Sequence, residues 1–152
     1  MTDSKMKSGA CLCGAVTVSA KLNGAVQACH CQQCQTWTGG GPYYVARGEG
    51  FQIKGEENIK RYRSSEWAER AFCGKCGTTL FWQMTDQPLG GLAAGLFAGN
   101  KGEPGATDAA LTMKREIFTD IRPAWVPISD APEQWTEGET MAHFGFGSAG
   151  EV

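Results

Sequence analysis

The chain lacks an excess of positive charge and lacks long apolar runs. Its 152 residues carry 14 lysines and arginines against 16 aspartates and glutamates, a formal net charge of −2 at pH 7. Binding to nucleic-acid phosphates needs a clustered basic surface, so we expect no nucleic-acid partner. The most apolar later stretch, residues 89–98, is too short and too rich in glycine to span a bilayer, so we expect no membrane partner.

The first nine residues also lack the apolar segment of a secretory signal peptide, and we therefore expect a cytoplasmic protein. In a reducing compartment, clustered cysteines are more often metal ligands or catalytic groups than disulfides. The odd number of cysteines, seven, would leave at least one thiol unpaired in a scheme made only of disulfides. A disulfide scaffold is therefore the weaker alternative.

No segment keeps a helical hydrophobic period for more than about three turns, and there is no internal repeat. Alternation at Val16 and Val18, followed by Asn23-Gly24, predicts a β-hairpin over residues 15–29. Further strands are predicted at residues 43–46, 51–54, 59–63, 68–72, 78–83, 116–120 and 125–128.

Short helices are expected only after Cys31 and around residues 108–113. A chain of this length supports one domain with a real core. We therefore expect a single, mostly antiparallel β domain over residues 1–152, with its core at about 9–135. The N-terminal residues and the tail from about residue 145 are expected to be loosely ordered.

The cysteines fall into three clusters, which are Cys11/Cys13, Cys29/Cys31/Cys34 and Cys73/Cys76. In an extended Cys-x-Cys segment both thiols point to the same face. The Cys-x-x-Cys-Gly segment at residues 73–77 is typical of a zinc knuckle, whose glycines permit the tight turn. The first and third clusters together supply four sulfurs, the closed ligand set of a structural zinc.

The middle cluster leaves three thiols, and three protein ligands with one open position are typical of a catalytic zinc. We therefore expect two zinc ions per chain, and we expect the trio to be the more exposed and more easily oxidised set. The alternative is a second structural zinc that His30, His143 or water completes. His30 should point away from the face that its cysteine neighbours share, as a packed imidazole rather than a ligand.

Three thiolates donate much charge to a metal, which makes water a poor fourth ligand, and no nearby His–Glu pair offers an obvious base. A substrate thiol fits better, because a free thiol with a pKa near 8.5 is mostly protonated at neutral pH and gains reactivity as a thiolate. The trio therefore indicates carbon–sulfur chemistry, in which a thiolate attacks an electrophilic carbon.

Four motifs in this order resemble the glutathione-dependent formaldehyde-activating enzyme family, also called the CENP-V/GFA domain, over about residues 9–135. They are Gly9-Ala-Cys11-Leu-Cys13-Gly14-Ala-Val16, Cys29-His30-Cys31-x-x-Cys34, Phe72-Cys73-x-x-Cys76-Gly77-x-x-Leu80 and Pro123-Ala-Trp125. The resemblance implies the Mss4-like fold of antiparallel β-sheets stapled by a structural zinc. It implies a structural zinc on Cys11, Cys13, Cys73 and Cys76, and a catalytic zinc on Cys29, Cys31 and Cys34.

The family's named reaction joins formaldehyde to glutathione to give S-(hydroxymethyl)glutathione, a carbon–sulfur lyase reaction in the reverse sense. The resemblance also suggests Gly39 and Gly40 as contacts to bound glutathione, although a plain turn explains them equally well. Of the arginines that could pair with its carboxylates (Arg47, Arg61, Arg63 and Arg70), Arg70 stands where the family often has arginine; solvated strand faces are the alternative. Two departures are Gln35, where many relatives have arginine, and Glu116, where many have histidine.

We therefore predict a zinc-dependent carbon–sulfur lyase or glutathione adduct synthase of the formaldehyde-activating type. Its partners would be a small-molecule thiol, with glutathione as co-substrate, and an electrophile such as an aldehyde. The alternative is a non-catalytic module that binds thiols through zinc or uses the stapled sheet to bind a protein.

Overall fold

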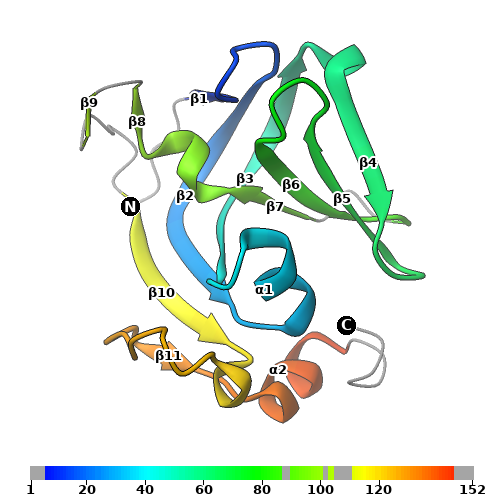
Figure 1. The fold of residues 1–152 in the computed structure, drawn as a ribbon. Helices are drawn as coiled ribbons and strands as arrows, with labels where there is room; N and C mark the ends of the chain where they lie inside the picture. The colour runs from blue at the N-terminus through cyan, green and yellow to red at the C-terminus, as the bar shows by residue number, and fades with distance from the viewer. Residues whose placement is uncertain (1–5, 87–89, 101–102, 105–110, 146–152) are drawn as a thin grey trace. The chain divides into compact units, whose positions relative to one another are not determined.

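The computed structural model describes residues 6–86, 90–100, 103–104 and 111–145 (Figure 1). The chain divides into two compact units, which we call unit 1 (residues 1–25 and 46–111) and unit 2 (residues 26–45 and 112–152). Strands β2 (Thr17–Cys29) and β3 (Tyr43–Lys54) contribute residues to both units. Each unit is therefore discontinuous in sequence, while each cysteine set lies within one unit.

Unit 1 is built on antiparallel pairing. Strand β1 (Met6–Ala10) pairs with the first part of β2, from Met6 opposite Lys21 to Ala10 opposite Thr17. Strands β4 (Ile59–Arg63), β5 (Ala68–Cys73), β6 (Thr79–Met84) and β7 (Gly90–Ala93) follow one another as antiparallel neighbours, the green ribbons of Figure 1. The unit also contains η1 (Glu56–Asn58), η2 (Ala94–Phe97), β8 (Gly99–Asn100) and β9 (Glu103–Pro104).

The core of unit 1 follows the alternation that starts just before β2, since Val16, Val18 and Ala20 are fully buried. Gly9 lets β1 approach η2 closely. A Cβ atom built at Gly9 would lie 2.1 Å from the carbonyl oxygen of Leu96. Any side chain there would push the two elements apart, so this position needs glycine.

Unit 2 contains helix α1 (Gln32–Thr38), β10 (Thr112–Ile117), η3 (Thr119–Ile121), β11 (Glu133–Gln134) and helix α2 (Glu137–Phe144). Thr136 caps α2, since its hydroxyl accepts from the amide of Glu139 while the Glu139 carboxylate accepts from the amide of Thr136. This reciprocal capping box satisfies two amides at the helix start. Neither helix, of seven and eight residues, is long and apolar enough to cross a membrane.

The mostly β class with few short helices is confirmed, including α1 after Cys31 and β4 at the predicted residues. The sheet is mixed rather than purely antiparallel, because β10 and β11 pair in parallel, Arg115 opposite Glu133. The hairpin over residues 15–29 is wrong. Residues 17–29 form the single strand β2, whose first part already has β1 as its antiparallel partner, so the strand continues through Asn23-Gly24, where Gly24 has a positive φ of +86°, without reversing.

Other boundaries differ from the prediction. Residues 43–46 and 51–54 belong to one strand, β3, and part of the N-terminal stretch forms β1 because β2 offers it a paired edge. Residues 125–128 are not a strand, and the parallel partner of β10 comes later, at β11. Of the helix expected around 108–113, Thr112 and Met113 lie in β10, and residues 105–110 are outside the described residues, as is the tail from 146.

Candidate metal centres

The four-sulfur cluster (Cys11, Cys13, Cys73 and Cys76) forms entirely within unit 1. Its four Sγ atoms all lie within 4.8 Å of one another. The Cys11–Cys13 sulfur separation is 3.6 Å and the Cys13–Cys73 separation is 3.8 Å. A tetrahedral zinc with Zn–S bonds of about 2.3 Å has sulfur–sulfur edges of about 3.8 Å. The donor set and its spacing therefore fit a structural zinc.

Two tight turns bring these sulfurs together. The amide of Gly14 donates to the carbonyl of Cys11 after β1, and the amide of Gly77 donates to the carbonyl of Cys73 after β5. Both glycines have positive φ, +80° and +77°, which other residues rarely adopt. The amide of Val16 also donates to the Cys11 sulfur at 3.3 Å. The loops thus preset the thiols and supply hydrogen bonds that favour their thiolate forms.

The pKa values in the four-sulfur cluster are driven apart. Hydrogen bonds from the hydroxyl and amide of Thr78 lower the pKa of Cys76 to about 5. At Cys13 the Ala15 amide lowers the pKa, but desolvation and the three neighbouring thiols outweigh it and raise the value to about 11. Sulfurs this close cannot all ionise without a compensating cation, which a metal ion would provide.

The trio (Cys29, Cys31 and Cys34) forms within unit 2, and its Sγ atoms also lie within 4.8 Å of one another. Cys29 ends β2, Cys31 is the N-cap of α1, and Cys34 lies in its first turn, where its amide donates to the Cys31 sulfur at 3.4 Å. No other cysteine, histidine, aspartate or glutamate of the described residues joins this group. The trio therefore offers three ligands and leaves a fourth coordination position without a protein ligand from that part of the chain.

The expected exposure of the trio is wrong. Cys29, Cys31 and Cys34 are only 8%, 2% and 4% exposed, whereas Cys13 of the four-sulfur cluster is exposed. The β2–α1 junction folds the three thiols inward. The thiols of Cys31 and Cys34, together with burial, raise the pKa of Cys29 well above its usual value. A cation at the trio would remove this penalty, so the donor set fits a metal here as well.

His30 is fully buried between two members of the trio and is packed, as expected, rather than part of the ligand group. Its Nε2 donates to Oε1 of Glu116 at 2.7 Å. The expectation that no His–Glu pair lies close to the trio is wrong, because β10 brings Glu116 to a residue 86 positions earlier. Local spacing could not reveal this pair.

The comparisons with known proteins agree with this geometry. The sequence profile of the glutathione-dependent formaldehyde-activating enzyme family matches residues 6–120. The chain belongs to this family. It is 34% identical over 136 residues to a Schizosaccharomyces pombe protein described as an uncharacterized lyase, covering 88% of this chain and 93% of that protein. The crystal structure of a Rhodobacter sphaeroides protein is similar, with a TM-score of 0.50 and 25% identity, over 64% of this chain and 96% of the other.

Gln35 lies in α1, directly after the trio of this formaldehyde-activating family member. Its side-chain amide donates to the carbonyl of His30 at 2.8 Å and to the carbonyl of Ile121 at 2.9 Å. Gln35 therefore fastens the start of α1 to η3 within unit 2. Through the carbonyl of His30, the Gln35 side chain is hydrogen-bonded to the backbone of the trio segment.

Gly39 and Gly40 close the other end of α1. Both amides donate to the carbonyl of Gln35, and Gly39 has the left-handed conformation of a helix C-cap, with φ +88°. The carbonyl of Gly40 accepts from Nε1 of Trp125 at 2.8 Å, and the indole ring covers the Gly40 α-carbon while remaining 73% exposed. The amides of both glycines are thus hydrogen-bonded within the chain.

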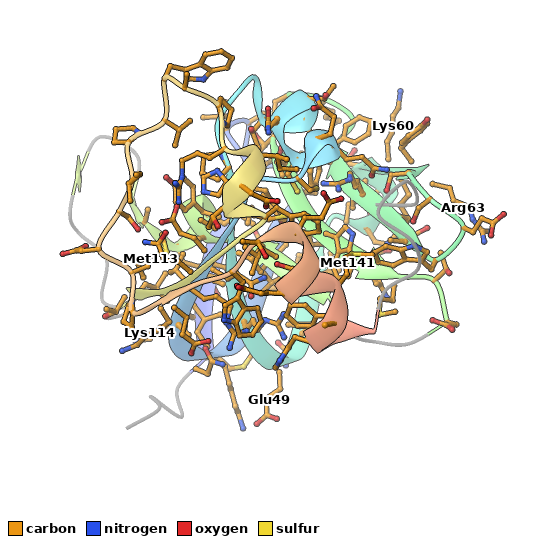
Figure 2. All side chains as sticks on the ribbon, turned by 90° about the horizontal axis from the view of Figure 1, so that it is seen from below. Glu49, Lys60, Arg63, Met113, Lys114 and Met141 are labelled. Atoms are coloured by element: carbon orange, nitrogen blue, oxygen red, sulfur yellow. The ribbon has the colours of Figure 1, made fainter. Side chains whose placement is uncertain are left out.

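The arginines considered for glutathione all lie in unit 1. Arg61 is paired with Glu56 at 2.8 Å and Glu69 at 3.2 Å. Arg63, labelled in Figure 2, donates to the carbonyl of Glu66 at 2.6 Å. Arg70 is buried on β5 opposite Trp82 of β6, and Arg47 lies on β3. The structure thus places Arg70 in a different unit from the trio and from Gly39 and Gly40.

Proposed function

We propose that this protein is a zinc-dependent carbon–sulfur lyase, or glutathione adduct synthase, of the formaldehyde-activating type. The observation that supports this most strongly is the trio: three buried thiols converge within 4.8 Å, and no further side chain of the described residues completes the ligand set. Membership of the family and the similarity to a protein described as a lyase support the reaction class.

In this proposal the four-sulfur cluster holds a structural zinc, and Cys29, Cys31 and Cys34 hold a catalytic one. A zinc ion bound by the trio would supply a Lewis acid that lowers the pKa of a thiol at its fourth position. The chain itself contributes the three thiolates, the α1 amide that hydrogen-bonds Cys31, and a buried setting that strengthens electrostatic interactions.

The reaction adds a thiol across the carbonyl group of an aldehyde. The sulfur forms a bond to the carbonyl carbon, the π bond breaks toward oxygen, and the proton lost by the thiol ends on that oxygen. With glutathione and formaldehyde the product is S-(hydroxymethyl)glutathione. The reverse reaction breaks the carbon–sulfur bond and is the lyase direction. Atoms balance without a further reactant, so neither an oxidant nor a reductant is needed.

Gly39, Gly40 and Arg70 are retained as proposed glutathione contacts. Because the amides of both glycines are already hydrogen-bonded within the chain, their contribution would be close backbone approach rather than hydrogen-bond donation. Arg70 would bind a carboxylate through its guanidinium. An Arg70→Lys variant that leaves the KM for glutathione unchanged would remove Arg70 from this set.

The decisive experiment measures the rate of exchange between free glutathione and its hydroxymethyl adduct by two-dimensional NMR, above the spontaneous rate. We expect the zinc-loaded protein to accelerate exchange and Cys34→Ser to lose this acceleration while staying folded. Thr36→Ser, a conservative change on the exposed side of the same helix, is the matched control and should behave like wild type.

Binding of glutathione to the trio's zinc without accelerated exchange would instead support the thiol-binding alternative. Full acceleration by Cys34→Ser would contradict the assignment of the trio. A cytoplasmic location stays a prediction from the sequence.

A further inference from the structure

Glu116 lies in a buried polar network that reaches the trio through a single residue. Its Oε1 accepts from Nε2 of His30, and its Oε2 accepts from the hydroxyl of Ser129 at 2.5 Å and from Arg122 at 3.3 Å. Glu116 and His30 are both buried, and Arg122 is nearly so. Such a network is rigid because every movement of the carboxylate would leave a buried charge or donor unsatisfied.

On the basis of the proposed function, we propose that Glu116 is a positioning residue for the trio. By anchoring the His30 ring, it fixes the relative positions of Cys29 and Cys31 for metal binding. His30 is the one residue between these two ligands, at the junction where β2 ends and α1 is capped. Rotation of its backbone would move the two flanking thiols relative to each other. What holds His30 therefore also holds two of the three sulfurs.

The backbone of His30 is fixed at both of its polar groups. Its amide donates to the carbonyl of Ile117 at 3.1 Å, and its carbonyl accepts from the side chain of Gln35 at 2.8 Å. The ring has a single polar anchor, because Nδ1 has no hydrogen-bond partner among the described residues. Glu116 is therefore the contact that decides the orientation of the ring.

Anchoring and simple electrostatics predict opposite effects of removing Glu116. A three-thiolate site with a divalent ion carries net negative charge, so loss of the carboxylate, with Arg122 retained, would favour metal binding by charge alone. Loss of the anchor would instead disfavour it, because metal binding would then have to order the Cys29–Cys31 segment. Partners that orient metal ligands typically change metal affinity by about 10- to 100-fold.

The test is a competition titration of reduced full-length protein against a colorimetric zinc chelator, which resolves two bound ions. We expect Glu116→Ala to weaken binding of the more weakly held ion, which we assign to the trio, by about 10-fold or more and to leave the ion of the four-sulfur cluster unchanged. Glu116→Gln keeps an oxygen that can accept from His30 and should recover most of the affinity. Glu133→Ala is the matched control, since Glu133 also pairs with an arginine of unit 2, Arg115, but makes no contact with His30.

Cobalt(II) substitution supplies a spectroscopic readout. Glu116→Ala should shift the visible d–d bands of the cobalt ion bound by the trio, while Glu116→Gln and Glu133→Ala should keep the wild-type spectrum. Unchanged or tighter binding of the trio's ion by Glu116→Ala would overturn the proposal. Equal weakening of both ions would also overturn it, because it would indicate a general loss of structure.

A second, milder variant tests the proposal if Glu116→Ala is insoluble. Ser129→Ala removes only one hydrogen bond from the Glu116 carboxylate and should weaken the ion of the trio by a few-fold, less than Glu116→Ala does. No change in that variant would overturn the proposal. Wild type that binds only one zinc would overturn both this inference and the proposed function, whereas two ions with an insensitive Glu116 would overturn the inference alone.

Discussion

The two cysteine sets of this chain differ in how they are built. The four-sulfur cluster joins segments about 60 residues apart in sequence, it has a solvent-exposed member in Cys13, and hydrogen bonds from loop amides and Thr78 surround it. The trio comes from a single short segment, all its thiols are buried, and His30 within that segment is hydrogen-bonded to Glu116 of a charged network. The set with four ligands is thus the more exposed one, and the set with only three ligands is the more buried one.

The comparison indicates a division of labour. An ion bound by all four thiolates would crosslink the segments that follow β1 and end β5, which are distant in the sequence of unit 1, so its binding free energy would contribute to folding. A trio on one continuous segment crosslinks almost nothing. Its preorganisation must come from the surrounding protein, which is the part that Glu116, Arg122 and Ser129 play in the proposal above.

The largest difference is expected between Cys73→Ser and Cys34→Ser. The apparent free energy of zinc binding at structural sites is about 10–16 kcal/mol, which is comparable to the whole net stability of a typical domain, roughly 5–15 kcal/mol. Cys73→Ser should therefore abolish soluble folding, while Cys34→Ser should stay folded with about one zinc. Circular dichroism and metal analysis check this. Equal structural damage from both variants would break the comparison.

A second difference concerns the order in which metal is lost. Reduced wild-type protein should contain close to two zinc ions per chain, and equilibrium titration with a chelator should remove the trio's ion first. The far-UV circular dichroism should stay constant through the loss of the first ion and change with the second. Unfolding that accompanies the first ion would show that the trio also carries the fold.

The third prediction concerns acid. At Glu116 burial raises the pKa, but hydrogen bonds from Ser129 and His30 and the charge of Arg122 outweigh it, so the pKa is lowered below its usual 4.5. The ionised carboxylate therefore stabilises the folded state above pH 4.5, and this contribution is lost as pH falls through the lowered pKa. Wild type should therefore lose more stability across that window than Glu116→Gln, as measured by urea unfolding at a series of pH values. Parallel pH profiles would contradict it.

The smallest effect is expected at the end of α1. Trp125→Phe removes the hydrogen bond from the indole to the carbonyl of Gly40, a contact at an exposed position. Its loss should cost about 0.5–1 kcal/mol, seen as a small decrease in Tm, with both zinc ions retained. Loss of the trio's zinc in this variant would show that the Gly40 loop supports the metal site more directly than the contacts suggest.

The two groups of neighbouring cysteines could be predicted from the sequence because cysteine spacing is a local property. Residues 11–13 and 73–77 each carry a recognisable loop, and the trio lies within six residues. Family membership was likewise predicted from the motifs and is confirmed by the match over residues 6–120. The roles of the individual ligands stay proposals.

What the sequence could not supply is long-range pairing. Asn23-Gly24 favours a hairpin locally, yet β2 continues through it because β1 offers a partner for its first half. Exposure of the trio was misjudged for the same reason, since burial depends on how β2 and α1 fold together. The His30–Glu116 pair depends on the position of β10, which no local pattern encodes.

The exposure of Cys13 to solvent would have a kinetic consequence for an ion bound by the four-sulfur cluster. An external ligand could displace the accessible Cys13 sulfur first, so the ion would be transferred to that ligand by stepwise exchange while the rest of the chain stays folded. A high equilibrium affinity for the ion would then be compatible with a fast rate of metal exchange. Isotopically labelled zinc should exchange into the four-sulfur cluster without global unfolding of the chain.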